Sequence, residues 1–535
     1  MPKFSGPLPR LAIIPPNQLA GTTRTHEGAP ALSRNARSDL FLLAVTNMVS
    51  EGTFYETASA RDSRFRNLIQ AATTEDPDWV ARFVPFLRDT MQMRSAAVVV
   101  AAETVRHRLT ARITGTIANR KIIDSACSRA DEPAELLAYW VSRYGHVIPK
   151  PVKRGIADAA VRLYTERTAL KYDGQSRAWR MADVINLTHP QPSAPWQEDL
   201  FKFLLGARYG DVQLRNFDRL PMIQAHRVLE DVPQADRGRF LDLLTATGQT
   251  DRLRAAGMAW EALSGWLGGP MDARAWSAVI PGMGYMALLR NLRNFDEAGV
   301  PDNVARSVAE RLADPDQVAA SRQFPFRFLS AYKAAPSLRW AWALERALDA
   351  AVPNIPELPG RSLVLIDTSG SMATSAISQR STITPVDAAA LFGLAVAKRN
   401  TGAVDVYGFG NDVFSHTVRP AESLLPAIKR FTARVGAAGH GTNIPGALGQ
   451  YSGHDRVFLF SDMQTMNDDR HGYRTVPESV PIYAFNLGGY APALPEMGRG
   501  NRHEFGGFSD AVFRMVPMLE AGMPAAIEQG RQNSL

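Results

Sequence analysis

The sequence contains almost no cysteine and no long apolar run. One of its 535 residues is a cysteine, Cys127, so no disulfide can form within the chain, as is usual in a reducing compartment. No run of about 18 or more apolar residues occurs, so we expect no membrane-spanning helix and no membrane partner. Prolines interrupt the first residues, which lack the continuous apolar stretch of a secretion signal. We therefore expect a cytoplasmic protein.

Motifs of common catalytic sites are also missing. The sequence contains no GxxxxGK[ST] phosphate loop, no HExxH zinc motif and no Cys/His cluster. One His–Glu pair, His503 and Glu504, is interpreted as part of a loop. We find no catalytic machinery and expect a protein that is not an enzyme.

Charge is distributed unevenly along the chain. Residues 1–355 hold 45 Lys and Arg against 37 Asp and Glu, a net charge of +8, whereas residues 356–535 hold 15 against 16. The window 141–180 carries nine basic side chains against three acidic ones. The nine are Arg143, Lys150, Lys153, Arg154, Arg162, Arg167, Lys171, Arg177 and Arg180. A surplus concentrated in one window favours a surface that binds a polyanion.

The periodicity of apolar residues divides the chain in two. From Ser38 to Ala350 it is helical and frequently interrupted, which predicts many short helices, one of them over Leu253–Leu267. Such a series is typical of an irregular helical-repeat array. Clustered prolines after residue 352 indicate a linker. We therefore expect a tail over residues 1–20, a helical domain over 21–355 and a second domain over 356–535.

The second domain has the pattern of a parallel sheet. Leu363–Ile366 and Val457–Phe460 are short and wholly apolar, as expected of strands buried on both faces. Val404–Phe409 and Ile482–Leu487 are further strands, and helical stretches lie between them. Thr384 is the expected N-cap of one such helix, which ends at Arg399. The alternation predicts a doubly wound α/β domain.

Oxygen-bearing side chains follow two of these strands. Asp367 comes directly after the first apolar run, and Asp462 follows another with one residue between them. In a parallel sheet both emerge at the same edge. Ser369, Ser371 and Thr442 add hydroxyls. Few charges and several neutral oxygens suit a hard cation such as Mg²⁺, which retains waters and accepts a further carboxylate from outside.

These motifs resemble those of known families. Residues 358–523, with the five cation ligands, look like a von Willebrand factor A domain and its metal-ion-dependent adhesion site. Four stretches resemble the TROVE domain of the Ro autoantigen family: Lys150–Asp158, Leu170–His189, Met283–Arg293 and Pro325–Lys333. The order of the two domains is that of the Ro family, and the chain resembles a bacterial Ro orthologue.

The resemblance implies a monomeric ring of HEAT-like helical hairpins closed by the A domain. Family members bind small noncoding Y RNA on an outer basic surface and single-stranded 3′ ends of misfolded noncoding RNA in a central hole. They act in RNA quality control and decay, in bacteria with an exoribonuclease such as polynucleotide phosphorylase. By similarity, the RNA-binding residues are Lys150, Lys153, Arg154, Lys171, Arg180 and His189.

Other interpretations of the same features remain open. From spacing alone, a solvated helix face explains the basic window as well as an RNA site does. The protein is alternatively a metal-dependent adhesion module or scaffold, in which the cation captures a partner's carboxylate. A third class is an enzyme or a motor-associated subunit, such as the metal-chelatase components that also carry A domains.

Overall fold

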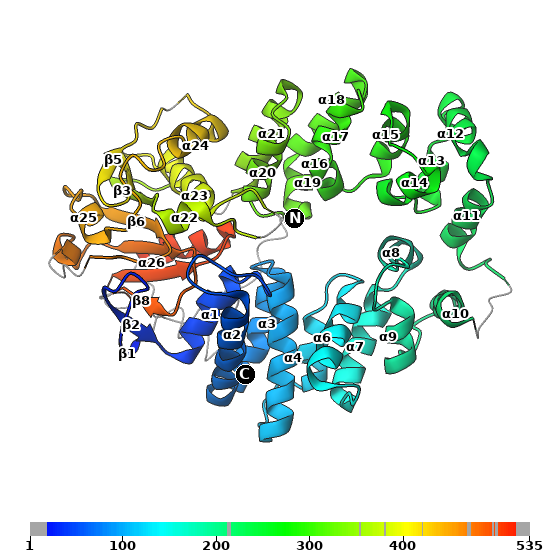
Figure 1. Ribbon diagram of the computed structural model, residues 1–535, viewed down its shortest axis with the longest axis horizontal. Coiled ribbons are helices and arrows are strands. Elements are labelled where there is room, and N and C mark those ends of the chain that lie inside the picture. Colours follow the sequence, from blue (N-terminus) through cyan, green and yellow to red (C-terminus); the bar gives the residue numbers. More distant parts are fainter. Residues whose placement is uncertain are drawn as a thin grey trace. The chain divides into compact units, whose positions relative to one another are not determined.

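The computed structural model describes residues 19–210, 216–352, 355–378, 381–419, 421–467, 472–494, 497 and 501–520 (Figure 1). The chain divides into two compact units. The sheet unit comprises Met1–Ala97, Arg322–Ser330 and Glu345–Leu535, and the helical unit comprises Val98–Ser321 and Ala331–Leu344. None of the described helices is both long enough and apolar enough to cross a membrane.

The sheet unit is built on a six-stranded sheet with the order β5-β4-β3-β6-β7-β9. Its strands are β3 (Ser362–Asp367), β4 (Val404–Phe409), β5 (Val413–Ser415), β6 (Arg456–Ser461), β7 (Ile482–Asn486) and β9 (Arg502–Gly506). Neighbouring strands are parallel except for β4 and β5. The four predicted strands are confirmed as β3, β4, β6 and β7. The order reverses between β3 and β6, as in a doubly wound sheet.

Helices cover both faces of this sheet. The covering helices include α23 (Pro385–Arg399) and α25 (Ile444–Leu448). Leu363 and Leu365 point to the face that packs against α25. On the other face α23 approaches β3 so closely that a Cβ on Gly393 would lie 2.7 Å from Ile366. Helix α23 begins as predicted, because Thr384 caps it. Burial on both faces accounts for the continuous apolar runs.

Strand β9 was not predicted, and the interpretation of His503 and Glu504 as a loop is wrong. The segment is an edge strand whose charged side chains have partners within the fold. The guanidinium of Arg502 donates to the carbonyl oxygens of Val480 and Val476, at 2.6 and 2.7 Å. The ring of His503 stacks on another aromatic ring of the sheet. A strand stabilised by such polar contacts carries no apolar run for sequence analysis to detect.

The N-terminal part of the chain belongs to the same compact unit as the C-terminal sheet. Strands β1 (Leu19–Arg24) and β2 (Pro30–Arg34) form a hairpin, and β2 pairs with β8 (Pro492–Ala493). Helices α1 (Ala36–Thr46), α2 (Ala58–Glu75) and α3 (Pro77–Asp89) follow in the same unit. This division differs from the expected boundary at residue 355, because the contacts responsible join residues more than 400 positions apart. The expected tail, residues 1–20, lies outside the described residues except for the first two of β1.

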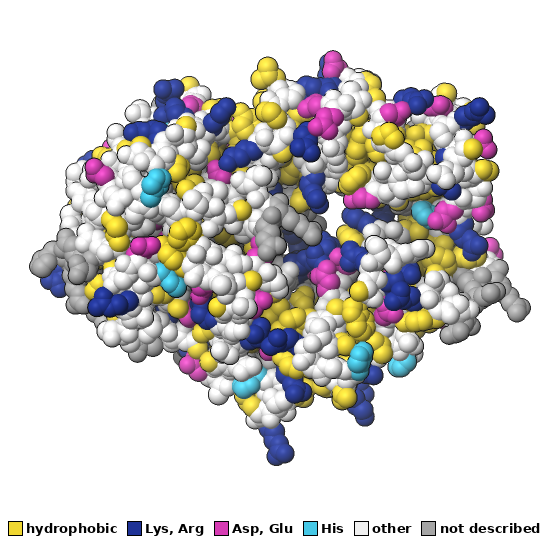
Figure 2. Space-filling model, in the orientation of Figure 1, with side chains coloured by type: hydrophobic (Ala, Val, Ile, Leu, Met, Phe, Trp, Pro, Cys, Tyr) yellow, Lys and Arg dark blue, Asp and Glu magenta, His cyan; other side chains and the backbone are white. Residues whose placement is uncertain are grey.

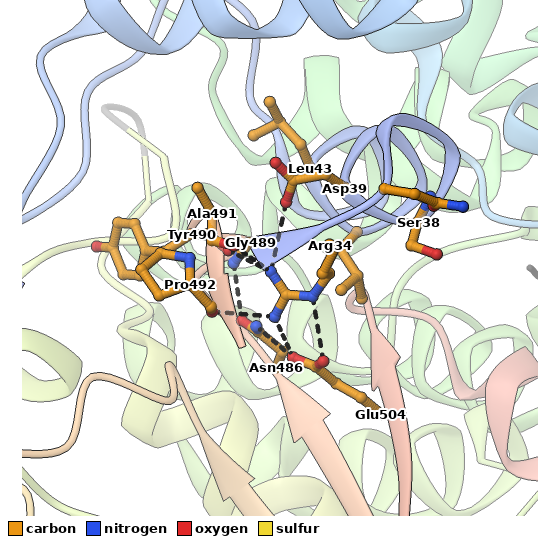
Figure 3. Close-up of polar contacts among 12 residues, drawn as sticks. Arg34, Ser38, Asp39, Leu43, Asn486, Gly489, Tyr490, Ala491, Pro492 and Glu504 are labelled. Atoms are coloured by element: carbon orange, nitrogen blue, oxygen red, sulfur yellow. Dashed lines mark hydrogen bonds and ion pairs between the residues drawn. The ribbon is translucent and has the colours of Figure 1, made fainter. Parts of the chain in front are cut away.

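A buried arginine fastens the hairpin to the sheet (Figure 3). The Arg34 side chain is 0% exposed and its partner Glu504 is 1% exposed. The guanidinium donates to both carboxylate oxygens of Glu504, at 2.5 and 3.1 Å. It also donates to the carbonyl oxygens of Tyr490 and Ala491, both at 2.8 Å. The carbonyl oxygen of Pro492 at 3.1 Å and Asp39 at 3.3 Å accept as well, so this buried cation is surrounded by acceptors.

The helical unit contains no strand within residues 98–210 and 216–321. Its helices are α4 (Arg94–Ala111), which starts in the sheet unit, α5 (Asn119–Ser125), α6 (Glu132–Tyr144), α7 (Lys150–Leu163), α8 (Glu166–Tyr172), α9 (Met181–Thr188), α10 (Pro195–Tyr209), α11 (Pro221–Glu230), α12 (Arg237–Ala246), α13 (Asp251–Ala255), α14 (Trp260–Leu267), α15 (Ala273–Val279), α16 (Tyr285–Arg290), α17 (Leu292–Glu297), α18 (Asp302–Ala313) and α19 (Pro315–Ser321). The series continues with α20 (Phe326–Ala334), which starts in the sheet unit, and α21 (Leu338–Ala351), which ends in it. The many short helices confirm the helical pattern, whereas a closed HEAT-like ring stays a prediction.

One predicted helix is two helices. The pattern over Leu253–Leu267 is broken between α13 and α14, because Gly257 adopts a φ of 63°. That left-handed conformation ends a helix and favours glycine. Elsewhere glycine allows close helix packing: a Cβ on Gly155 of α7 would lie 2.5 Å from the carbonyl oxygen of Arg120 in α5.

Replacing Arg34 tests the attachment of the hairpin. Arg34→Ala leaves Glu504 buried without its cation, so we expect the free energy of unfolding of the sheet unit to fall by about 3–5 kcal/mol. Arg37→Ala is the control, because the Arg37 side chain is 23% exposed and forms surface ion pairs with Glu75 and Asp76. It should cost less than about 1 kcal/mol. Urea unfolding of the full-length variants measures both, and equal losses would contradict the buried attachment.

Candidate cation site and basic surface

The two predicted carboxylates lie at one edge of the sheet. Asp367 ends β3, and Asp462 follows Ser461 at the end of the neighbouring strand β6. The two strands are parallel, with Ile366 opposite Phe460. Both therefore end at the same edge of the sheet, at the point where the strand order reverses. This is the edge at which doubly wound sheets bind ligands.

The structure buries all five predicted cation ligands. The exposed fractions are 0% for Asp367, 1% for Ser369, 5% for Ser371, 2% for Thr442 and 3% for Asp462. The Thr442 loop packs on the loop after β6, since the carbonyl oxygen of Thr442 accepts from the N–H of Met466 at 2.9 Å. Oxygen ligands from three separate loops are therefore assembled at one sheet edge.

Hydrogen bonds fix the orientation of Asp367. One carboxylate oxygen accepts from the N–H of Ser369 at 2.8 Å, and the other accepts from the Ser461 hydroxyl at 2.5 Å. The hydroxyls of Ser369 and Ser371 lie 3.3 Å apart. The N–H of Gln464 donates to Asp462 at 3.2 Å. Each side chain is held before any ligand arrives.

The electrostatics of this site favour a bound cation. Burial raises the pKa of Asp367, and burial together with the charge of Asp367 raises the pKa of Asp462. The charge of Glu27 raises the pKa of Asp462 slightly further. A divalent cation would offset this repulsion. Among the described residues no three Asp, Glu, His or Cys side chains come close enough to hold a metal ion, so a cation here would also need the hydroxyls as ligands. Carboxylates with hydroxyls and water are the donors that Mg²⁺ takes.

The segment between α1 and α2 lies beside this site, which the sequence did not predict. A cavity of about 40 Å³ is lined by Ser371 and Asp462 from the sheet edge and by Glu51, Thr53 and Phe54 from the N-terminal segment. Nothing in a single sequence links residues 51–54 with residue 462, because no short motif spans such a separation.

Three of the predicted RNA-binding residues start helix α7. Lys150 and Arg154 are exposed, and Lys153 is partly buried. The opposite side of the helix is apolar: Val152 and Ile156 are each 0% exposed. The cations thus lie on the face of α7 that is turned to solvent.

The remaining predicted RNA-binding residues differ in how far their side chains are exposed to solvent. Lys171 is exposed near the end of α8, with its ammonium 5.1 Å from the ring centre of Tyr172. His189 is exposed after α9 in a left-handed conformation with φ 49°. Arg180, however, is only 9% exposed, and its guanidinium donates to Asp173 at 2.5 Å. Arg180 therefore stabilises the start of α9 and is less available to a ligand than the sequence led us to expect.

Several neighbouring cations are already paired. Arg120 binds Asp158, and Arg162 binds Asp124. In the view of Figure 2, Lys and Arg side chains are interleaved with Asp and Glu and form no single continuous patch. The exposed Lys150, Arg154 and Lys171, together with the exposed Arg143 and Arg167, are what the basic window offers a polyanion.

These features define a class of protein: a helical array with exposed cations, on the same chain as a doubly wound domain with two buried carboxylates where its strand order reverses. The TROVE domain profile matches residues 260–339. RNA-binding protein RO60 from Deinococcus radiodurans is 26% identical over 303 residues, which are 52% of each chain, so this chain spans about half the length of that relative. The RO (RSR) protein of Deinococcus radiodurans has a similar fold, with a TM-score of 0.60 at 18% identity over 91% of this chain and 100% of that one. The resemblance to the Ro family is confirmed, and the chain is a relative of the bacterial Ro proteins.

The burial of Arg180 gives a prediction that separates structural from exposed cations. In Arg180→Ala, Asp173 keeps the N–H of Met181 as a donor but loses its buried cation. We expect the free energy of unfolding of the helical unit to fall by about 3 kcal/mol. Arg154→Ala should change it by less than about 0.5 kcal/mol. Thermal or urea unfolding of the full-length protein measures the difference, and an unchanged Arg180→Ala variant would show that the pair is not structural.

Proposed function

We propose that the protein is a noncatalytic RNA-binding protein. Its helical unit carries exposed cations on α7 and α8, and the similar Deinococcus protein is named as RNA-binding. The observation that carries the proposal is the exposed pair Lys150 and Arg154 on α7, because their ammonium and guanidinium groups are free to meet phosphates. His189 is exposed, and in this proposal it would stack on an unpaired base or form a hydrogen bond with it.

The resemblance to the Ro family gives this proposal a finer form. The RNA is a small noncoding Y-like RNA, bound on the outer basic surface of a monomeric ring. Single-stranded 3′ ends of misfolded noncoding RNA enter the central hole. The protein then acts in cytoplasmic RNA quality control, with an exoribonuclease such as polynucleotide phosphorylase as a partner.

We further propose that the sheet edge binds Mg²⁺. Asp367, Asp462 and Thr442 would hold it together with the hydroxyls of Ser369 and Ser371. All five are buried, and hydrogen bonds orient Asp367 and Asp462. When bound, Mg²⁺ supplies positive charge that offsets the two carboxylates and organises the oxygen ligands. The metal-dependent adhesion alternative is less well supported, since the N-terminal segment already lies beside the site.

The RNA proposal predicts a steep dependence on salt and on two side chains. With about four phosphate contacts, the slope of log K against log[salt] should be about −3 to −4. Lys153→Glu with Arg154→Glu should weaken binding of a structured small RNA by more than about tenfold, since each charge-assisted contact contributes about 1.5–3 kcal/mol. Gel-shift titrations at two salt concentrations measure both.

A matched control separates local contact from net charge. Arg239→Glu with Arg252→Glu makes the same charge change on α12 and α13, at two exposed positions. It should weaken binding by about threefold or less. Equal losses in the two double variants, or a salt slope near zero, would show that the α7 residues are only a solvated helix face.

The cation proposal predicts that Asp367→Ala abolishes Mg²⁺ binding. The remaining hydroxyls and one carboxylate compete poorly with water for the ion. Asp405→Ala is the control. Asp405 lies near the amino end of β4, whereas the proposed site lies at the carboxyl ends of the strands. RNA affinity should change by less than about twofold in both variants, since the exposed cations are on the helical unit. Calorimetric titration of Mg²⁺ provides the test, and wild-type affinity in Asp367→Ala would reject the site.

A further inference from the structure

A charged cavity lies between α5 and α7, within the helical unit. It has a volume of about 420 Å³ and is lined by three cationic side chains, two carboxylates and one alanine: Arg120, Lys121, Arg162, Asp124, Asp158 and Ala118. The side chains of Arg120, Lys121 and Arg162 are 54%, 70% and 46% exposed. The close contact of Gly155 in α7 with the backbone of α5 fixes the separation of the two helices. A charged ligand can therefore reach these side chains from solvent.

The cavity continues a stripe of cations along α7. Four side chains follow one another at intervals of four residues, which places them along one side of the helix: Lys150, Arg154, Asp158 and Arg162. The three cations of this stripe are exposed, and Asp158 is its one carboxylate. The surface proposed to meet RNA phosphates therefore runs into the cavity, where a single negative charge interrupts it.

The two carboxylates of the cavity differ in burial and in partners. Asp124 is 7% exposed and accepts hydrogen bonds from the ammonium of Lys121 at 2.8 Å and the guanidinium of Arg162 at 2.6 Å. Arg162 also donates to the carbonyl oxygen of Cys127 at 2.8 Å. These bonds join the last turns of α5 and α7, so the contact between Asp124 and Arg162 is structural.

The pair of Arg120 and Asp158, in contrast, faces water. The guanidinium donates to both carboxylate oxygens, at 2.5 and 2.7 Å, and the two side chains are 54% and 36% exposed. An ion pair in contact with water contributes little to stability, because both groups are well hydrated when they separate. Arg120 can therefore exchange its carboxylate for another anion while both helices stay folded.

A phosphate has the geometry to take the place of Asp158. Like a carboxylate, it offers two oxygens that accept a parallel pair of N–H bonds from a guanidinium. A phosphate of RNA also releases condensed counterions when a cation neutralises it, which favours its binding further. The ammonium of Lys121 has three donors and gives one to Asp124, so it can add a second contact.

We propose that the cavity between α5 and α7 binds a phosphate of the RNA backbone, and that Asp158 occupies Arg120 until RNA displaces it. This rests on the proposed RNA binding and deepens it by naming a contact outside α7 and α8. Asp158 lowers the affinity for every RNA, so only an RNA that also engages the cations of α7 gains enough to displace it. The carboxylate thus makes the site more selective against isolated phosphates.

The test measures the affinity of full-length variants for a hairpin RNA with a single-stranded 3′ tail, by gel-shift titration. Asp158→Asn keeps the shape of the side chain and removes its charge, so RNA should bind about fivefold more tightly. The slope of log K against log[salt] should become steeper by up to about 1, because Arg120 then brings an unpaired charge to the phosphate. Arg120→Ala should weaken binding by about tenfold, since it also leaves Asp158 unpaired beside the RNA.

A matched control separates this exchange from a change in net charge. Asp242 forms an exposed ion pair with Arg274 at 2.7 Å in the same unit and is 49% exposed, so Asp242→Asn makes the same charge change at a similar pair. It should alter RNA affinity by less than about twofold. In the Arg120→Ala background, Asp158→Asn should also gain less than about twofold, because its effect passes through Arg120. All these variants should unfold at the urea concentration of the wild type, since both pairs are exposed.

The possible failures point to different conclusions. Unchanged or weaker RNA binding by Asp158→Asn, while Lys153→Glu with Arg154→Glu still weakens it, would overturn the exchange and leave RNA binding standing. A gain that persists in the Arg120→Ala background, or that Asp242→Asn matches, would show a general effect of charge and overturn the exchange as well. No RNA binding by the wild type would overturn the proposed function and the exchange with it.

Discussion

The buried pairing of Arg34 with Glu504 is the contact on which the arrangement of the sheet unit depends. It joins the second strand of the chain to the last strand of the sheet, 470 residues away. A buried guanidinium is tolerated only where carboxylates and carbonyl oxygens surround it, as they do here. Through this contact the β1–β2 hairpin is held in place, and with it the turn that meets the loop after β6.

The central part of the sheet could be predicted because its physics is local. Strands buried on both faces must be apolar throughout, so β3 and β6 can be recognised in the sequence as continuous apolar runs. The end of such a strand fixes where the next side chain points, which placed Asp367 and Asp462 together. Helix capping is local as well: Thr384, followed by a proline in the first turn, predicted the start of α23.

The parts that escaped prediction depend on contacts between distant residues. Strand β2 is short and partly polar, and β8 has only two residues, so each is stabilised by its pairing with the other. Glu504 lies in a polar segment that the sequence suggested is a loop. The contact that explains its position in a strand is its bond to Arg34, which no local pattern reveals. The sequence suggested that Arg180 is one of the RNA-binding cations of the basic window. In the structure its side chain is buried and forms an ion pair with Asp173, seven residues earlier. Composition identifies a charge surplus but does not say which charges face solvent.

The two units divide the proposed work between them. The helical unit carries the exposed cations for RNA, and the sheet unit carries buried oxygens for a cation. The most direct test of the central claim is to crosslink RNA to the full-length protein in its native cells, purify the complex and sequence the RNA. We predict strong enrichment of a few small, structured noncoding RNAs, lost when Lys153 and Arg154 are changed to Glu. RNA that matches the cellular background, in wild type and variant alike, would contradict RNA binding as the function of this protein.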